Sequence, residues 1–264
     1  MKSRFLIFLL TLILTLNGAN MASILPIPKI VIEKKGEFLL EGNIVIVFNK
    51  NDARINYAIN LLKESIAVKT KSGVLINEKA SKQNIKLELI QSEEMINKNI
   101  PKDKLDEAYI LNIENNSISI SAEKEAGLFY GCMSLLQLID NCENNKLISM
   151  EIIDYPDMRM RGISDDISRG QVSKLENFKK IISFLARYKM NTYLPYIEDM
   201  IEFSKYPSMP RSRSLTVSSD ITHCGLNTAK QLVTWEYCSN ISFQFGSTWC
   251  SNTSNKKIIS TFPN

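Results

Sequence analysis

The chain has 264 residues, of which 44% are hydrophobic, and a net charge of +4 from 32 basic and 28 acidic residues. This composition is that of a globular protein with a packed core, and it excludes a disordered or fibrous chain. The basic residues form no block and no stripe interleaved with aromatic residues, which argues against nucleic acid as a partner.

The amino terminus has the pattern of a secretory signal peptide. Lys2 and Arg4 precede an apolar run over residues 5–16, and small and polar residues follow it. We therefore expect a signal peptide over residues 1–22 and a secreted or cell-surface protein; a retained anchor or lipoprotein-like tether is the alternative. No later segment approaches the ~20 apolar residues of a membrane helix, so no membrane span is expected once the signal is removed.

Residues 25–153 alternate short β runs with two helical patterns. Apolar residues at helical spacing predict helices over residues 52–67 and 123–139, and residues 91–105 are interpreted as a charged loop. The expected strands cover residues 29–33, 37–40, 43–48, 86–90, 109–113, 117–121 and 147–153. The pattern predicts an α+β amino-terminal domain over residues 25–153, with Tyr109, Phe129 and Tyr130 in or near its core.

The period changes after a junction at residues 154–157. Residues 158–164 and 192–197 are extended runs, and an amphipathic helix is expected between them over residues 175–188. This is a β-α-β unit, which makes parallel neighbours, and one form it takes is the opening of a (β/α)₈ barrel.

Cysteine and histidine give no metal or cofactor signal. There is no C-x-x-C and no H-E-x-x-H, and His223 is the sole histidine, which excludes a zinc protease. Cys132 and Cys142 fall in and just after the second helix and are expected to be structural thiols. The cysteine spacings match no zinc site and no disulfide framework.

Residues 211–264 differ from the rest of the chain. They hold both tryptophans and three of the five cysteines, with 17 Ser and Thr residues but only seven charged residues. A Ser/Thr-rich linker is one interpretation, but linkers seldom collect Trp and Cys. The other hypothesis is an anomalous, frameshifted or disordered tail. No amphipathic helix or clean strand is expected there, apart from weak runs near residues 241–245 and 258–259.

Four short strings carry a resemblance to a known family: D-Y-P-D at residues 154–157, R-G-I-S-D-D-I-S-R at 161–169, Y-K-M-N at 188–191 and K-Y-P at 205–207. In this order they resemble the start of the catalytic barrel of glycoside hydrolase family 20, the β-N-acetylhexosaminidases. The domain before them resembles the non-catalytic, zincin-like domain of that family. The implied fold is thus an α+β domain followed by the first β-α-β unit of a truncated (β/α)₈ TIM barrel over residues 157–210.

The resemblance implies hydrolysis of terminal N-acetylhexosamine residues of glycans by substrate assistance, in which the sugar's own acetamido oxygen attacks the anomeric carbon. It also implies that the reaction requires no metal and no organic cofactor. Arg161 matches an arginine that hydrogen-bonds sugar hydroxyls, and we expect it at the carboxyl end of the first barrel strand. The alternative is a junction arginine paired with Asp154 or Asp157. Asp166 matches the aspartate of the same string, although Asp165 and Asp166 could equally cap the loop before the helix.

The second strand departs from the family pattern, because Tyr196 stands where a histidine is expected. Glu198 and Asp199 follow as an acidic pair at a strand's carboxyl end, where barrel chemistry resides. The family's catalytic Asp-Glu pair comes later, after the fourth strand, so we include Glu198 and Asp199 among the substrate-binding candidates and name no catalytic residue.

Length determines the expected activity. A (β/α)₈ barrel needs about 250 residues, whereas 107 follow Asp157. The polypeptide is therefore expected to be inactive. The rival hypotheses are a secreted non-catalytic carbohydrate-binding or surface module and a secreted structural domain without a ligand.

Overall fold

The structure is a computed structural model that describes residues 24–48, 50, 52–70, 73–76, 83–166, 174–196 and 242–243. The expected signal peptide, Glu198, Asp199 and most of the tail lie outside these residues. The chain divides into two compact units. The first comprises residues 1–157 together with Arg187–Lys189, and the second comprises residues 158–186 and 190–264.

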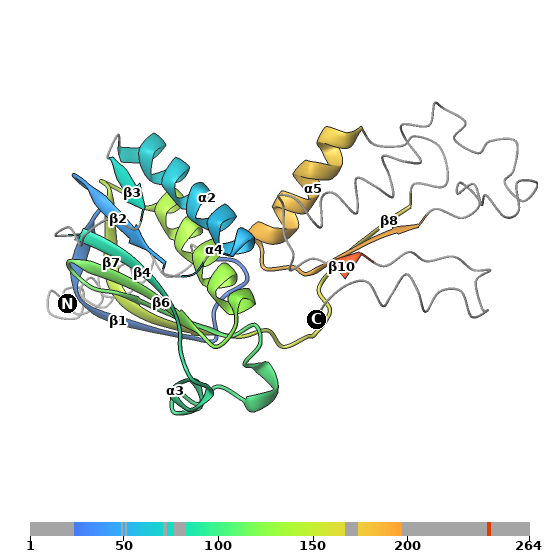
Figure 1. The fold of residues 1–264 in the computed structure, drawn as a ribbon, viewed down its shortest axis with the longest axis horizontal. Coiled ribbons are helices and arrows are strands. Elements are labelled where there is room, and N and C mark those ends of the chain that lie inside the picture. The colour runs from blue at the N-terminus through green and yellow to red at the C-terminus, as the bar shows by residue number, and fades with distance from the viewer. Residues whose placement is uncertain are drawn as a thin grey trace, which may run out of the picture. The chain divides into compact units, whose positions relative to one another are not determined.

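The first unit contains a seven-stranded sheet with two long helices on one face (Figure 1). Its order is β1-β7-β5-β6-β4-β2-β3, antiparallel among β1, β7, β5 and β6 and parallel from β6 to β3. The strands are β1 Ile30–Leu39, β2 Ile44–Val47, β3 Val74–Ile76, β4 Gln83–Leu89, β5 Tyr109–Ile113, β6 Ser117–Ala122 and β7 Lys146–Asp154, and the helices are α2 Ala53–Thr70 and α4 Glu125–Asn141. The predicted α+β class is confirmed.

Both helices form where the apolar spacing predicts them. The Asp52 carboxylate starts α2, because its Oδ1 accepts hydrogen bonds from the amides of Arg54 at 2.9 Å and Ile55 at 3.2 Å. Burial alone would raise the pKa of Asp52, but the Arg54 guanidinium and these amides hold it below its usual value. The predicted core aromatics Tyr109, Phe129 and Tyr130 are buried, which confirms that prediction.

Two local predictions are wrong. The runs at residues 29–33 and 37–40 were expected to be two strands, but they form one strand, β1. A bulge between Glu33 and Glu37 stands where the sequence pattern indicated a break. Gly36 makes the bulge possible: its φ is 119°, and a Cβ there would lie 1.8 Å from Asn115 Oδ1. Residues 91–105 are not simply a charged loop, because they form helix α3, Ser92–Ile96, and the short 3₁₀ helix η3, Lys102–Lys104.

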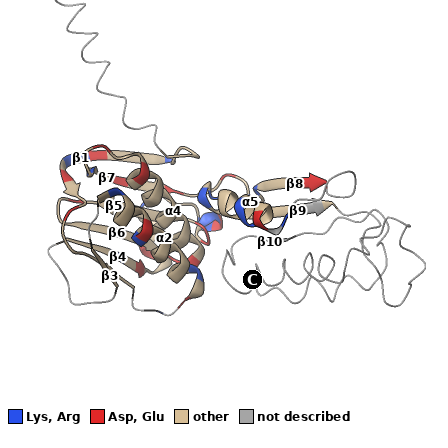
Figure 2. Ribbon diagram, turned by 90° about the horizontal axis from the view of Figure 1, so that it is seen from above, with Lys and Arg blue, Asp and Glu red and all other residues tan. Residues whose placement is uncertain are grey.

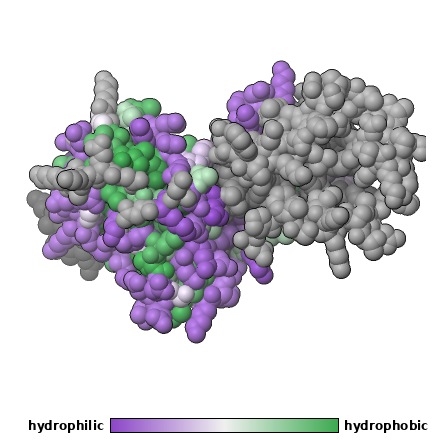
Figure 3. Space-filling model, in the orientation of Figure 1, coloured by the Kyte–Doolittle hydropathy of each residue, from purple (hydrophilic) through white to green (hydrophobic). Residues whose placement is uncertain are grey.

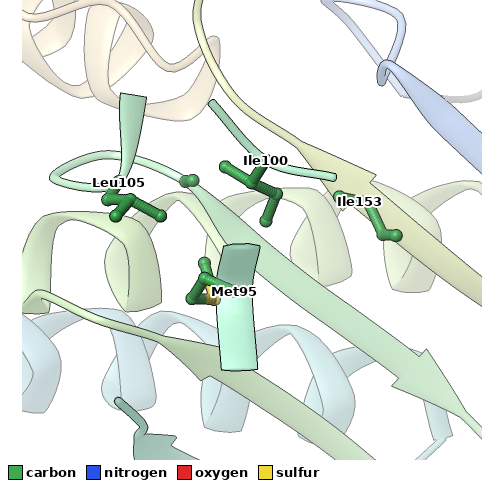
Figure 4. Close-up of a cluster of buried hydrophobic side chains, with 5 residues drawn as sticks. Met95, Ile100, Leu105 and Ile153 are labelled. Atoms are coloured by element: carbon green, nitrogen blue, oxygen red, sulfur yellow. The ribbon is translucent and has the colours of Figure 1, made fainter. Parts of the chain in front are cut away.

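The segment that contains α3 has its own small core. Met95, Ile100 and Leu105 pack around Ile153 of β7 and are each at most 8% exposed (Figure 4). These three apolar residues are five apart and lie among charged neighbours, so they match neither the helical nor the strand period. The contact that orders them comes from a strand about 50 residues further along the chain, which explains why the local pattern misses it.

Glu151 of β7 forms ion pairs with two lysines from other parts of the chain. Its Oε1 lies 2.6 Å from Lys98 Nζ, and its Oε2 lies 3.4 Å from Lys34 Nζ of β1. Lys98 and then Lys34 hold the pKa of Glu151 below its usual value, although partial burial opposes them. The ionised carboxylate therefore ties the α3 segment and the edge strand to β7.

Glu151→Gln should lower the free energy of unfolding by roughly 0.5–1 kcal/mol at pH 7. Because the folded pKa is depressed, this stabilisation is present above the unfolded value of 4.5 and is lost as the pH falls through the folded pKa. Urea unfolding at pH 7, 5, 4 and 3 should show the two proteins converging in acid. The control is Glu93→Gln, an exposed glutamate of α3; a difference for Glu151→Gln that persists unchanged at pH 3 would contradict the prediction.

The second unit contains the expected β-α-β arrangement. Strand β8, Gly162–Asp166, and strand β9, Thr192–Tyr196, are parallel and joined through helix α5, Leu175–Arg187. A two-residue strand, β10 Ser242–Phe243, pairs parallel to β9 and lies in one of the two weak runs of the tail, where no clean strand was expected. The predicted period change after residue 157 thus corresponds to a real change from mixed to parallel strand pairing.

Charged residues of both signs are interspersed along the described elements, as Figure 2 shows. Among the coloured residues on the face drawn in Figure 3, hydrophilic areas surround smaller apolar areas. Among the residues that the structure describes, no helix is both long and apolar enough to cross a membrane.

Candidate functional site

The candidate site lies at the carboxyl ends of the parallel strands β8 and β9. Their register places Asp165 opposite Pro195 and Asp166 opposite Tyr196. Figure 2 shows the acidic end of β8 at its arrowhead. Parallel strands bring their carboxyl ends to the same edge, which is where ligands bind in barrel and open α/β proteins.

The two aspartates of β8 face opposite ways. Asp165 Oδ2 accepts a hydrogen bond of 2.8 Å from Tyr193 Oη, and the buried Tyr193 ring packs edge-on against Phe178 of α5 with centroids 6.2 Å apart. Burial, and then Asp165, raise the pKa of Tyr193, so its hydroxyl remains a donor. Side chains alternate along a strand. Asp165 therefore belongs to the α5 side, and the exposed Asp166 belongs to the other face.

Arg161 is not where we expected it. Strand β8 begins at Gly162, so Arg161 precedes its amino end and not its carboxyl end. Its Nη1 donates to the Met158 carbonyl at 2.8 Å. The alternative partners of the sequence-based hypothesis are bound elsewhere: Asp154 pairs with Lys189 and Asp157 pairs with Lys29. The sugar-contact role of Arg161 stays a prediction, but its expected position at the carboxyl end of the strand no longer supports it.

Part of the R-G and M-N strings has a structural role that sequence reasoning missed. The Asn191 side chain accepts a hydrogen bond from the Arg161 amide at 2.9 Å and donates to the Arg159 carbonyl at 2.8 Å. At Gly162 a Cβ would lie 1.8 Å from the Thr192 carbonyl oxygen, so only glycine allows β8 to approach β9 this closely. These residues join the two strands at their amino ends. Gly162 at the start of one extended run and Asn191 directly before the next are the sequence signal that could have indicated this structural role.

The remaining predicted site residues are not brought together by the described structure. Glu198 and Asp199 lie outside the described residues, as does the segment 167–173 that follows β8. Tyr196, at the histidine position of the family pattern, is half-buried beside Asp166 in register. Of the four candidates, Asp166 is thus the one that the structure places at the carboxyl edge.

Within the described ranges, no group of three His, Cys, Asp or Glu side chains could hold a metal ion. Cys132 and Cys142 are free thiols. Burial raises the pKa of Cys132 to about 12 and also raises that of the half-buried Cys142. Burial therefore keeps both thiols protonated at neutral pH, which is compatible with the structural role predicted for them.

Solved structures resemble this fold. The protein named CpGH84D superimposes with a TM-score of 0.61 at 19% sequence identity, over 90% of this chain and 40% of that one. The chitobiase of Flavobacterium johnsoniae superimposes with a TM-score of 0.54 at 25% identity, over 72% of this chain and 30% of that one. The first likeness concerns the fold alone.

The sequence itself matches a family and its members. A β-hexosaminidase of Porphyromonas gingivalis is 32% identical over 140 residues, which cover 48% of this chain and 18% of that protein. The chain thus spans about a fifth of the length of that curated relative. The family model for domain 2 of glycosyl hydrolase family 20 matches residues 21–155, slightly more than half of the chain. The chain belongs to glycosyl hydrolase family 20.

Proposed function

We propose that this chain supplies the non-catalytic α+β domain and the first barrel strands of a glycosidase that removes terminal N-acetylhexosamine residues from glycans. The single observation that carries the proposal is the order of two features. The family-20 domain over residues 21–155 is followed directly by a parallel β-α-β unit that begins with the R-G-x-x-x-D string. Relatives that are similar in sequence are named β-hexosaminidase and β-N-acetylhexosaminidase.

The proposed reaction is substrate-assisted. The acetamido oxygen of the sugar attacks its own anomeric carbon, while one carboxylic acid protonates the leaving oxygen and one carboxylate offsets the charge of the cyclic intermediate. The family resemblance places that Asp-Glu pair after a fourth barrel strand. The described part of the second unit contains only β8, β9 and the two-residue β10. We therefore propose that these 264 residues alone do not turn over substrate.

Asp166 is the side chain that we propose touches the sugar. It ends β8 on the face opposite α5, it is exposed, and its register partner is Tyr196. A carboxylate at this edge accepts hydrogen bonds from sugar hydroxyls, each worth roughly 1.5–3 kcal/mol. Asp165 is the matched control, because its carboxylate is held by Tyr193 on the other face. Arg161, Glu198 and Asp199 are further substrate-binding candidates.

The first arm of the test assays the purified 264-residue polypeptide with chromogenic N-acetylglucosaminide and N-acetylgalactosaminide substrates. The P. gingivalis relative serves as the positive control. We expect no turnover above a buffer blank, and clear turnover would refute the proposed inactivity. Glycan binding by the inactive polypeptide would favour the non-catalytic carbohydrate-binding alternative instead.

The second arm uses a completed barrel, either a longer product of the same gene or a fusion of this chain to the rest of a relative's barrel. Asp166→Asn should lower kcat/KM about 10- to 100-fold, as expected for the loss of one charged hydrogen bond. Asp165→Asn should instead lower thermal stability and leave kcat/KM within about threefold. Equal kinetic losses in the two variants would contradict the assignment of Asp166.

Export to the cell surface or the medium is part of the same proposal. It rests on the basic and apolar pattern of residues 1–22 and on the extracellular glycans that such a glycosidase would process. Fractionation of cells that express the chain tests it: we expect the protein, shortened by about 22 residues, in the medium or on the cell envelope.

A further inference from the structure

We propose that the α+β unit is completed by residues Arg187–Lys189, which the buried polar side chains Asp154 and Gln137 hold in place, so that the folding unit extends beyond the family match at residues 21–155. This inference is independent of the proposed function. It concerns which parts of the chain must be present for the unit to be stable. The division of the chain into compact units already assigns residues 187–189 to the first unit, and the side-chain contacts give the physical reason.

The first contact is a buried ion pair. Lys189 Nζ lies 2.7 Å from Asp154 Oδ2, and the two side chains are 7% and 11% exposed. Tyr109 Oη donates to the same carboxylate oxygen at 3.0 Å and lies 2.5 Å from Ser134 Oγ. We call Asp154, Lys189, Tyr109 and Ser134 the Asp154 cluster. Burial, and then the Asp154 charge, hold the pKa of Tyr109 well above its usual value, so its hydroxyl keeps its proton.

Lys189 is surrounded by further acceptors. Its Nζ donates to Tyr109 Oη at 3.3 Å and to the Pro26 carbonyl at 3.4 Å, and it lies 5.6 Å from the centroid of the Tyr109 ring. A buried ammonium needs such partners, because taking a charge out of water costs several kcal/mol. The Asp154 cluster and the Pro26 carbonyl therefore supply the partners that the buried Lys189 ammonium needs in the first unit.

The second contact is Gln137 of α4, which is 4% exposed. Its Nε2 donates to the Arg187 carbonyl at 3.0 Å and to the Leu25 carbonyl at 2.9 Å, while its Oε1 accepts from the Leu25 amide at 2.8 Å. Asp154 Oδ1 in turn accepts from the Lys29 amide at 3.3 Å. Two buried side chains thus hold two distant backbone segments, residues 25–29 and 187–189.

The backbone of Lys189 indicates that its side chain is required. Its φ is 58°, in the left-handed region, and the Met190 amide bonds to the Leu185 carbonyl at 2.8 Å. This is the helix-ending motif in which glycine is the preferred residue at the left-handed position. A lysine there has a backbone cost and loses side-chain freedom on burial. Such a conformation persists when the surrounding contacts require it.

A unit cut at residue 157 would lose this arrangement. Asp154 would lose the cation that lies 2.7 Å from its carboxylate, and removing one partner of a buried pair is strongly destabilising. One Nε2 donor bond of Gln137 would also lack its acceptor, Arg187. The family match ends at residue 155, so the matched residues alone lack the segment that satisfies their own buried carboxylate.

The decisive variant is Lys189→Gly in the full 264-residue chain. Judged by the backbone alone, glycine at a left-handed position should stabilise the protein. If the ion pair matters, the melting temperature should instead fall by roughly 10 °C. The matched control is Asn99→Gly, because Asn99 is exposed and has a φ of 62°; its melting temperature should stay within about 2 °C of wild type or rise. An unchanged or raised melting temperature for Lys189→Gly would overturn the proposal.

Hydrogen exchange adds a local readout. In Lys189→Gly the peptides that cover residues 24–29 and 187–190 should exchange about tenfold faster under native conditions, because the Leu25 and Lys29 amides donate to Gln137 and Asp154. Peptides from α2 should keep wild-type exchange. If Lys189→Gly does not fold, the double variant Asp154→Asn, Lys189→Met removes both charges and should recover at least half of the loss in melting temperature. Failure of that recovery, or wild-type exchange in both segments, overturns the proposal.

Discussion

Gly127→Ala should lower the free energy of unfolding by about 2 kcal/mol or more, although alanine is the better helix former by ~1 kcal/mol. Gly127 lies in the first turn of α4, and a Cβ there would lie 2.1 Å from the Ala108 carbonyl oxygen and 2.8 Å from Ala122 Cβ. At Gly131, one turn further, an added Cβ would lie 2.4 Å from Ile120 Cγ2. The helix approaches β5 and β6 so closely that a single methyl group must displace backbone.

The measurement for Gly127→Ala is urea unfolding followed by far-ultraviolet circular dichroism. Asn60→Ala is the matched control, because Asn60 is exposed on α2 and alanine there has the same favourable helix propensity without a steric contact. The control should be neutral or slightly stabilising. A stabilised Gly127→Ala protein would mean that α4 does not pack this closely on the sheet.

Phe38→Ala should cost about 3–5 kcal/mol, the range for removing a buried aromatic side chain. Phe38 lies near the end of β1, opposite Leu147 of β7, and is 0% exposed although most of β1 is exposed. Phe38 is the one buried residue among the ten of β1, so we expect its ring to contribute most to anchoring this edge strand. Removing it leaves a cavity that the rigid sheet can fill only partly.

Thermal and urea unfolding of Phe38→Ala should be compared with Phe184→Ala. Phe184 lies on α5 and is 54% exposed, so the same chemical change there should cost less than about 1 kcal/mol. The comparison separates burial from residue type. Equal losses in the two variants would be incompatible with a buried Phe38 and an exposed Phe184.

Local patterns were sufficient for most elements of the fold. The two long helices, the β5–β6 hairpin and the β-α-β unit after residue 157 were expected from apolar spacing and turn residues. Their ends agree within three residues, except that β8 begins at Gly162, four residues later than expected. Family membership followed from short strings and was confirmed by the match over residues 21–155. These features depend on residues that are near one another in the chain.

The site was less predictable from the sequence. The string that carries the resemblance matches Asp166, but the local pattern leaves Asp165 and Asp166 equally able to cap the loop. The structure separates them, because Tyr193, 28 residues away, holds Asp165 on the α5 side. Arg161 was expected at the wrong end of β8, because a short sequence string does not show where a strand begins or ends. Strand β8 begins where Gly162 pairs with Thr192 of β9, and a partner about 30 residues away is not visible in the string.

The sequence by itself determined the α+β class, the order of its two parts and the family, because periodicity, turn residues and short strings are properties of neighbouring residues. Only the tertiary structure decided that residues 91–105 pack against Ile153, that β1 is one strand with a bulge at Gly36, and that Lys189 belongs to the amino-terminal unit. Each of these depends on a contact between residues far apart in the chain. Burial and charge pairing at such contacts outweigh the local preference of the residues that make them.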